Sequence, residues 1–175
     1  MMGPTDILRE EHRVILNTLS ALETAASRLA GGPALPDGWW ERIIHFLKSF
    51  ADRNHHAKEE SLLFPALVKA GVPSEGGPIG VMLEEHVQGR ALIQRMATAG
   101  DAAPRAKAAQ DYVRLLRDHI AKEDGVLWPL AEAVLDEPLQ QSLLREFRNV
   151  EAEQGRDASI DSAEAVVKEL GAALG

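Results

Sequence analysis

Apolar residues recur along this chain at intervals of three, four and seven positions, which is the spacing of one buried face of an α-helix. Stretches rich in glycine and proline separate four long segments of this kind, and we predict a helix for each segment. Their approximate bounds are 5–30, 38–70, 79–99 and 105–135. The same spacing predicts that Leu62 of the second segment and Val126 of the fourth segment lie on the buried face. The pattern therefore predicts an all-α protein whose helices pack through apolar seams.

Polar residues interrupt each of these seams where a packed helix would normally carry an apolar side chain. The interrupting residues are His12 in the first segment, His55 and Glu59 in the second, His86 in the third, and His119 and Glu123 in the fourth. Buried without partners, such groups would each cost several kcal/mol, roughly 2–7. No other residue in the seams is polar enough to satisfy them all. A metal ion bound by the whole set would remove this cost, so the seams predict an internal metal site.

One stretch of the second segment is repeated in the fourth. Residues 55–65 read HHAKEESLLFP and residues 119–129 read HIAKEDGVLWP. Residues four apart lie on the same face of a helix. His55 with Glu59, and His119 with Glu123, can therefore each present an imidazole and a carboxylate to one point. Two helices with the same local chemistry are expected for the two halves of a pseudo-symmetric binuclear centre.

The repeat also decides between neighbouring candidates. His56 and Glu60 are four residues apart as well, but His56 corresponds to Ile120, which cannot bind a metal. We therefore expect His56 to lie outside the ligand set, and Glu60 to lie around that set or at the surface. His45 has no counterpart in the fourth segment and is expected at the edge of the bundle. Tyr112 lies two turns before the fourth-segment histidine, and we expect it to pack in the core.

Each copy of the repeat ends in a proline, Pro65 or Pro129, six residues after its glutamate. A proline inside a helix removes one backbone hydrogen bond and bends the helix. Two bends at equivalent depth would indicate a geometric need that the two copies share. The alternative is that each helix simply ends at its proline.

The composition limits the chemistry that such a site can use. The chain of 175 residues has no cysteine, which excludes disulfides, thiol catalysis and cysteine-bound zinc or iron–sulfur centres within it. A mixed set of histidines and carboxylates favours iron, manganese or zinc over calcium or magnesium. The net charge of -8, without a lysine and arginine cluster, argues against a nucleic-acid partner. The chain has no long apolar run and no signal-peptide core, which predicts a cytoplasmic protein without a membrane partner.

The ordered series resembles the hemerythrin-like, or HHE cation-binding, family over roughly residues 5–135. The series is a lone histidine, a His-x-x-x-Glu pair followed by Glu-x-x-Leu-Phe-Pro, a second lone histidine and another His-x-x-x-Glu pair. The resemblance implies an antiparallel, up-and-down four-helix bundle that holds two iron ions joined by an oxo or hydroxo bridge. It also implies that Glu59 and Glu123 bridge the irons and that the other four residues, His12, His55, His86 and His119, are terminal ligands.

The resemblance and the helical pattern together suggest a division of the chain. Residues 1–135 are expected to form the metal-binding bundle. Residues 136–175 carry two further amphipathic segments, at about 139–153 and 160–174, but no metal-ligand pattern. We expect these segments to form helices that pack on the outside of the bundle.

Two positions depart from the oxygen-carrying hemerythrins. Those proteins have a fifth histidine one turn before the third-helix ligand, where this chain has Met82. Their fourth-helix carboxylate lies five residues after its histidine, a spacing that would select Asp124, whereas the internal repeat selects Glu123. With four histidines, about two coordination positions stay open, against about one with a fifth histidine. Open positions favour reaction with peroxide, oxygen or nitric oxide, in a catalase- or peroxidase-like scavenger, over simple oxygen carriage.

Three other functions stay open. The chain could be a module that binds or senses oxygen or nitric oxide, or a metal-free structural bundle. It could also store or donate iron, although ferritin-type sites use Glu-x-x-His rather than His-x-x-x-Glu. Relatives proposed to repair iron–sulfur clusters carry a cysteine-bearing segment before the bundle. This chain has no cysteine and only a few residues before its first predicted helix, so we do not expect that segment here.

Overall fold

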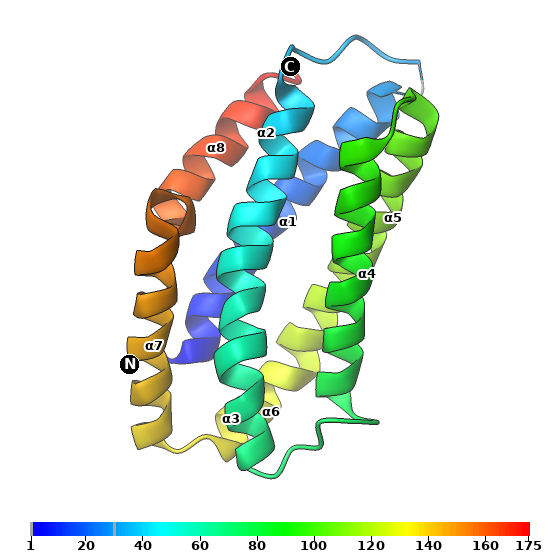
Figure 1. The fold of residues 1–175 in the computed structure, drawn as a ribbon. Helices are drawn as coiled ribbons and strands as arrows, with labels where there is room; N and C mark the ends of the chain where they lie inside the picture. Colours follow the sequence, from blue (N-terminus) through cyan, green and yellow to red (C-terminus); the bar gives the residue numbers. More distant parts are fainter. Residues whose placement is uncertain (1, 30) are drawn as a thin grey trace.

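The computed structural model describes residues 2–29 and 31–175, and these residues form helices joined by turns, without a β-strand among them (Figure 1). The elements are α1 (Pro4–Leu29), α2 (Trp39–Phe46), η1 (Leu47–His56), η2 (Glu59–Leu63), α3 (Phe64–Lys69), α4 (Pro78–Thr98), α5 (Ala102–Lys122), η3 (Glu123–Leu127), α6 (Trp128–Val134), α7 (Glu137–Gln154), η4 (Gly155–Ala158) and α8 (Ile160–Ala172). Here η1, η2 and η3 are π-helical and η4 is a 3₁₀ turn. The fold class is therefore all-α, as predicted, while the predicted helix end at Ala30 lies outside the described residues.

Several of these elements join into two long helical columns. One column runs from α2 through η1 and η2 to α3, and the other runs from α5 through η3 to α6 (Figure 1). The first helix, α1, packs along α5, which also packs along α4. Thus α1, α4 and the two columns correspond to the four predicted segments. None of the helices in the described part of the chain has the length and apolarity needed to cross a membrane.

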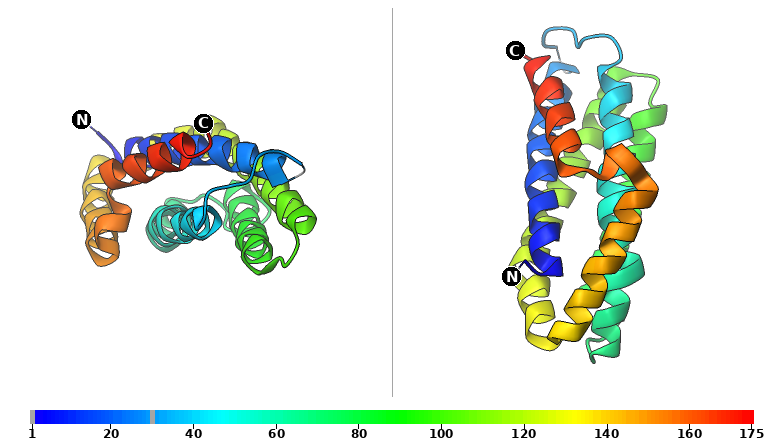
Figure 2. Two further views of the ribbon diagram at one scale, coloured as in Figure 1. Left: turned by 90° about the horizontal axis from the view of Figure 1, so that it is seen from above. Right: turned by 90° about the vertical axis from the view of Figure 1, so that its left-hand side faces the viewer.

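The last two helices pack along one side of the molecule. After the α6 column, α7 turns back and contacts α1, η1 and η2, and α8 then lies against α1 and α2 (Figure 2). Asp136 begins α7 by accepting a hydrogen bond from the backbone N–H of Leu139, which is a normal helix N-cap. Residues 136–175 therefore cover the side formed by α1 and the α2–α3 column.

Apolar side chains form two buried clusters with a buried polar layer between them. The larger cluster includes Leu19, Leu47 and Leu116, and the smaller one includes Phe64 and Trp128. The predicted metal ligands belong to this polar layer. On α1, on α4 and on each column, they follow residues of one cluster in the sequence and precede residues of the other. The apolar side chains therefore keep water away from the polar layer on both sides.

Both copies of the repeat contain a π-helical turn directly before the proline. The backbone N–H of Phe64 donates to the carbonyl of Glu59, and that of Trp128 donates to the carbonyl of Glu123. Both bonds span five residues instead of four. A proline has no N–H and clashes with the carbonyl four residues earlier, and a wider turn relieves that clash. The helices continue beyond the prolines as α3 and α6, so the alternative that they end there is wrong.

The π turns shift the buried face of each column by one residue. The structure buries Leu63 and Leu127, whereas Leu62 is only partly buried and Val126 is 57% exposed. The expectation that Val126 lies on the buried seam is wrong because it carried α-helical spacing through a turn that contains an additional residue. Leu62 still packs against the smaller cluster, although it is less buried than Leu63. Since the shift is the same in both columns, their similarity is preserved.

Candidate metal centre

All six predicted ligands are brought together in the buried polar layer. Each of them has at most 1% of its surface exposed; they are His12, His55, Glu59, His86, His119 and Glu123. The histidines form two pairs. The rings of His12 and His55 have centroids 4.7 Å apart, and those of His86 and His119 have centroids 4.8 Å apart. We call these the first pair and the second pair.

Each buried glutamate contacts one histidine of each pair. The two carboxylate oxygens of Glu59 lie 3.1 Å from Nε2 of His55 and 3.4 Å from Nε2 of His86. Oε2 of Glu123 lies 3.1 Å from Nε2 of His12 and 3.3 Å from Nε2 of His119. Both carboxylates therefore span the two pairs, which is where carboxylates that bridge two metal ions would lie.

The four histidines direct Nε2 toward the glutamates and Nδ1 outward to a further carboxylate. The Nδ1 distances are 2.9 Å from His12 to Asp124, 2.9 Å from His55 to Glu11, 2.7 Å from His86 to Glu60 and 3.0 Å from His119 to Glu85. A carboxylate can only accept, so Nδ1–H is the donor in each case. This leaves the Nε2 lone pair of a neutral ring pointing into the centre. Metal-binding histidines are commonly oriented by outer carboxylates of this kind.

These contacts separate the two acids that compete for the place on the fourth segment. Asp124 is partly exposed and bonds to the outer nitrogen of His12, whereas Glu123 is fully buried between the two pairs. Glu60 likewise bonds to His86 from outside and also accepts a hydrogen bond from Arg90 at 2.7 Å. The geometry favours Glu123 over Asp124, and ligation of a metal by either residue stays a prediction.

Two of the outer acids, Glu11 on α1 and Glu85 on α4, are themselves held by lysines of the two columns. Lys58 donates to Glu11, which bonds to His55, and we call this series the first half of the centre. Lys122 donates to Glu85, which bonds to His119, and we call this series the second half. In the first half Asn54 also donates to Glu11, at 2.9 Å. The two lysines occupy the same place in the internal repeat, three residues after the histidine. The repeat therefore specifies a supporting contact as well as candidate ligands.

Glu11 and Glu85 were not among the predicted site residues, although the sequence contains a signal for them. The triplet Glu-Glu-His occurs at residues 10–12 and again at residues 84–86. In both places the acid directly before the histidine bonds to a histidine of a neighbouring column, His55 or His119. With this second repeat, each contact between a histidine and its outer acid in one half has a counterpart in the other half.

The buried carboxylates favour positive charge at the centre. Burial alone would lower the pKa of His55, but Glu59 and Glu11 outweigh it and raise that pKa to about 10. For His86, Glu59 and Glu60 likewise outweigh burial and raise the pKa to about 9. Burial would raise the pKa of Glu59, yet His55 and His86 hold it well below its usual value. The centre therefore attracts either protons or metal cations.

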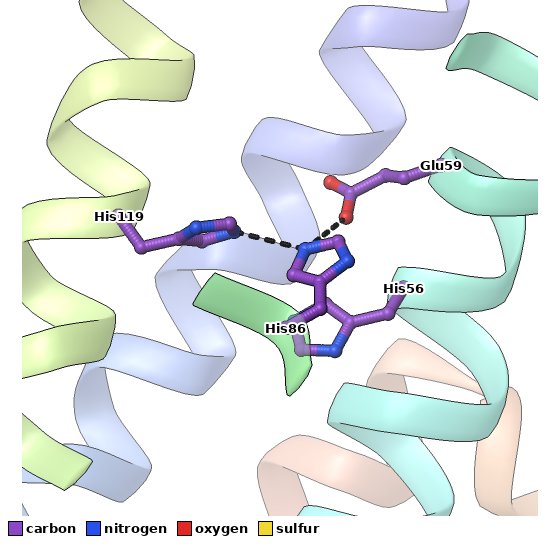
Figure 3. A group of neighbouring side chains, drawn as sticks. All are labelled: His56, Glu59, His86 and His119. Atoms are coloured by element: carbon purple, nitrogen blue, oxygen red, sulfur yellow. Dashed lines mark hydrogen bonds and ion pairs between the residues drawn. The ribbon is translucent and has the colours of Figure 1, made fainter. Parts of the chain in front are cut away.

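Protons alone cannot satisfy every contact in the centre. Nε2 of His86 lies 3.1 Å from Nε2 of His119, and two N–H groups cannot both occupy that space (Figure 3). Both carboxylate oxygens of Glu59 and Oε1 of Glu123 are buried without a partner in hydrogen-bond geometry, although Nε2 atoms lie at ion-pair distance from Glu59. Cations between the rings and the carboxylates would satisfy both the nitrogens and the oxygens. The donor set therefore fits a metal centre.

The other residues considered from the sequence fall into two groups. His45 is exposed and lies 3.1 Å from Asp157, well apart from the six converging residues, and Met82 and Tyr112 are packed in the two apolar clusters. These positions agree with the expectations for them. His56 has a buried ring beside that of His86 at the edge of the centre, and its place outside the ligand set stays a prediction (Figure 3).

The chain is similar to known proteins along most of its length. It is 27% identical over 182 residues to an uncharacterised protein of Mycobacterium tuberculosis and of Mycobacterium bovis, a match that covers 97% of this chain and 70% of that protein. It is 30% identical over 137 residues to the iron–sulfur cluster repair protein YtfE of Escherichia coli, which covers 71% of this chain and 61% of that protein. No solved structure matches.

Residues 3–131 match the family described as "hemerythrin HHE cation binding domain". The match begins just before α1, ends in α6 and includes all six residues that converge in the polar layer. The buried set of imidazoles and carboxylates indicates metal binding, and the family match over most of the chain indicates the same. The chain is a metal-binding protein that belongs to the hemerythrin HHE cation-binding family.

Proposed function

We propose that the chain is an antiparallel, up-and-down four-helix bundle that binds two iron ions and reacts with small oxidants, hydrogen peroxide above all. The proposed ligands are His12, His55, Glu59, His86, His119 and Glu123. The observation that carries the proposal is that each buried glutamate contacts one histidine of each pair. Residues 1–135 would form the bundle, and residues 136–175 would cover one of its sides.

When bound, two irons would supply the two-electron change that disproportionation of peroxide to water and oxygen requires. The residues of the chain would fix where that chemistry takes place. The outer acids hold each histidine in the tautomer that directs the Nε2 lone pair inward. The two apolar clusters exclude bulk water, which strengthens the electrostatic interactions of Glu59 and Glu123 with any cation between them.

Acids at the edge of the centre could exchange protons with solvent. Asp124 and Glu60 are both partly exposed, and each bonds directly to a histidine that lies inside the centre. A peroxide reaction takes up and releases protons, so groups that reach from the surface to the centre are useful to it. Each of these two acids joins the surface to Nδ1 of His12 or His86 in one step.

Iron-loaded, full-length protein provides the test. We expect it to evolve oxygen from hydrogen peroxide and to show a change in its visible spectrum in a single turnover. Glu59→Ala protein, which loses a contact to both pairs, serves as the control and should do neither. If the wild-type protein binds iron but shows neither response, the oxidant chemistry is wrong. A stable, reversible oxygen or nitric oxide adduct would instead favour a binding or sensing module.

Iron–sulfur cluster repair is the second candidate, and the similarity to the repair protein of Escherichia coli is the observation that favours it. In that case the two irons would be donated rather than retained. The assay is recovery of activity by an oxidatively damaged iron–sulfur enzyme after addition of the iron-loaded protein. Recovery that matches the loss of iron from the protein would favour this function over peroxide removal and over plain storage.

A further inference from the structure

One buried histidine has no counterpart in the pseudo-symmetric centre. His56 is 4% exposed, and its ring lies against that of His86 with centroids 3.9 Å apart and planes inclined by 19° (Figure 3). The ring of His119 is 5.9 Å away. One potential ligand atom from each of His56, Glu59, His86 and His119 lies within 4.8 Å of the others. His56 therefore belongs spatially to the second pair, although it adjoins His55 of the first pair in sequence.

The backbone explains how neighbouring residues can reach different pairs. His55 and His56 are the last two residues of η1, a π-helical segment of ten residues. Most π-helical segments are single turns, and they occur frequently at functional sites. A π-helix has more residues per turn, so successive side chains diverge by less than the 100° of an α-helix. The rings of His55 and His56 are consequently only 5.6 Å apart and lie on the same side of the column.

The polar contacts of His56 are incomplete. Its Nδ1 is buried and has no hydrogen-bond partner. The nearest acid is Asp52, whose Oδ1 lies 3.5 Å from that nitrogen and accepts a hydrogen bond from Arg90 at 2.8 Å. Arg90, Asp52 and His56 therefore follow one another in the order of cation, acid and imidazole. Lys58, Glu11 and His55 have the same order. A buried imidazole without a hydrogen bond destabilises the fold unless it has another partner.

The other column shows that this polar pair is not needed for packing. By the internal repeat, His56 and Asp52 correspond to Ile120 and Leu116 of the α5–α6 column. Both of these are buried and belong to the larger apolar cluster. An apolar pair thus fills the equivalent space without difficulty, and the histidine and aspartate indicate a requirement specific to the second pair.

On the basis of the metal centre proposed above, we propose that His56 is a fifth histidine ligand, bound to the same metal ion as His86 and His119. The oxygen-carrying hemerythrins have their fifth histidine on the third helix, where this chain has Met82. In this chain His56, on the second segment, would provide that imidazole instead. The two ions together would then keep about one open coordination position instead of about two. That open position would belong to the ion held by His12 and His55.

His56→Phe tests the inference, because phenylalanine keeps a flat ring against His86 but has no nitrogen to bind a metal. We expect this variant to hold its second iron at least about tenfold more weakly and to show altered charge-transfer bands. Imidazole added to a His56→Ala variant should restore the wild-type spectrum. His45→Ala, which removes an exposed histidine of the same column, should change neither iron content nor spectrum.

Each result has one meaning. If the wild-type protein holds two irons and His56→Phe keeps both with an unchanged spectrum, His56 only packs against His86 and the inference is wrong. If the wild-type protein holds no iron, the proposed function itself fails. Circular dichroism of the metal-free variants reports whether they fold. Rescue by imidazole separates a missing ligand from a damaged fold, because free imidazole cannot repair the fold.

Discussion

The two halves of the centre share one set of contacts and differ in what surrounds them. In the first half, Lys58 is completely buried beneath α7, where it donates to Glu151 at 2.7 Å and lies 5.7 Å from the ring centre of Phe147. Its counterpart Lys122 has a side chain that is 41% exposed, and it contacts Glu85 at the surface. The repeat thus fixes which groups meet, while the C-terminal helices decide how far each group is removed from water.

This difference assigns separate tasks to the two halves. A buried lysine destabilises the fold unless carboxylates pair with it, and Lys58 has both Glu11 and Glu151 as partners. The first half therefore contacts the extension directly, through Glu151 of α7. The second half has the more exposed lysine, and the additional histidine, His56, lies beside its histidines. Variants that act on one half, or on both, can test this distinction.

The largest effect is expected from Glu59→Ala, because Glu59 is in contact with both halves. We predict that this variant loses both irons, since each ion loses one of its two bridging carboxylates. Iron analysis of the purified variant measures the effect. Glu60→Gln is the matched control, and it should keep both irons because Glu60 bonds only to the outer nitrogen of His86. The reverse result would overturn the choice of ligands on the second segment.

Replacement of the two lysines compares the halves directly. Lys58→Met leaves Glu11 and Glu151 without their buried cation and should lower the free energy of unfolding by about 3–5 kcal/mol. Lys122→Met breaks a pair that is partly in water and should lower it by less than about 1 kcal/mol. Denaturant unfolding of the metal-free proteins gives both values. Equal effects would show that the cover provided by α7 has no energetic consequence.

The stability of the metal-free protein should depend on pH through the raised histidine pKa values. A group whose pKa is higher in the folded state stabilises the fold fully below its unfolded pKa, and this stabilisation is lost as the pH rises through the folded value. For His86 and His55 the window runs from about 6.5 to about 9 and 10. The free energy of unfolding should therefore fall between pH 7 and pH 10.

Iron loading supplies the control for this pH dependence. Bound histidines are neutral at Nε2, so loading near pH 7 should release protons into a weakly buffered solution. The loaded protein should then lose less stability between pH 7 and pH 10 than the metal-free protein. Identical pH profiles for the two forms would mean that the raised pKa values do not belong to metal-binding histidines.

The smallest effect is expected from Glu151→Gln, which weakens the contact between α7 and Lys58 without altering any proposed ligand. The side chain of Glu151 is partly exposed, so we expect a loss of about 0.5–1 kcal/mol and unchanged iron content. Glu153→Gln changes an exposed acid on the same helix and should have no measurable effect. A loss of iron from the Glu151→Gln protein would show that the extension acts on the metal centre itself.

Much of the candidate site follows from local patterns in the sequence. The seams and the repeat select the six converging residues, because a polar side chain on an apolar face and an identical spacing on two helices are both visible along the chain. Glu11 and Glu85 carry a signal of the same kind in their repeated Glu-Glu-His triplets. That signal becomes meaningful only when the neighbouring column that faces each acid is known.

Other features depend on backbone geometry that the helical pattern does not contain. The π turns change the angle between successive residues, which buries Leu127 in place of Val126 and brings His56 beside His86. The burial of Lys58 depends on α7, whose amphipathic pattern predicts a helix but does not identify the side of the bundle that it covers. Tertiary packing, and not local preference, determines these features.

The central claim is that the two halves hold two irons between them, bridged by the shared glutamates. The most direct test is the iron content of full-length protein purified in air, together with its visible spectrum. The account predicts about two irons per chain and charge-transfer bands that disappear when iron is removed by a chelator. Less than about one metal per chain, with a thermal stability that a chelator does not change, would contradict it.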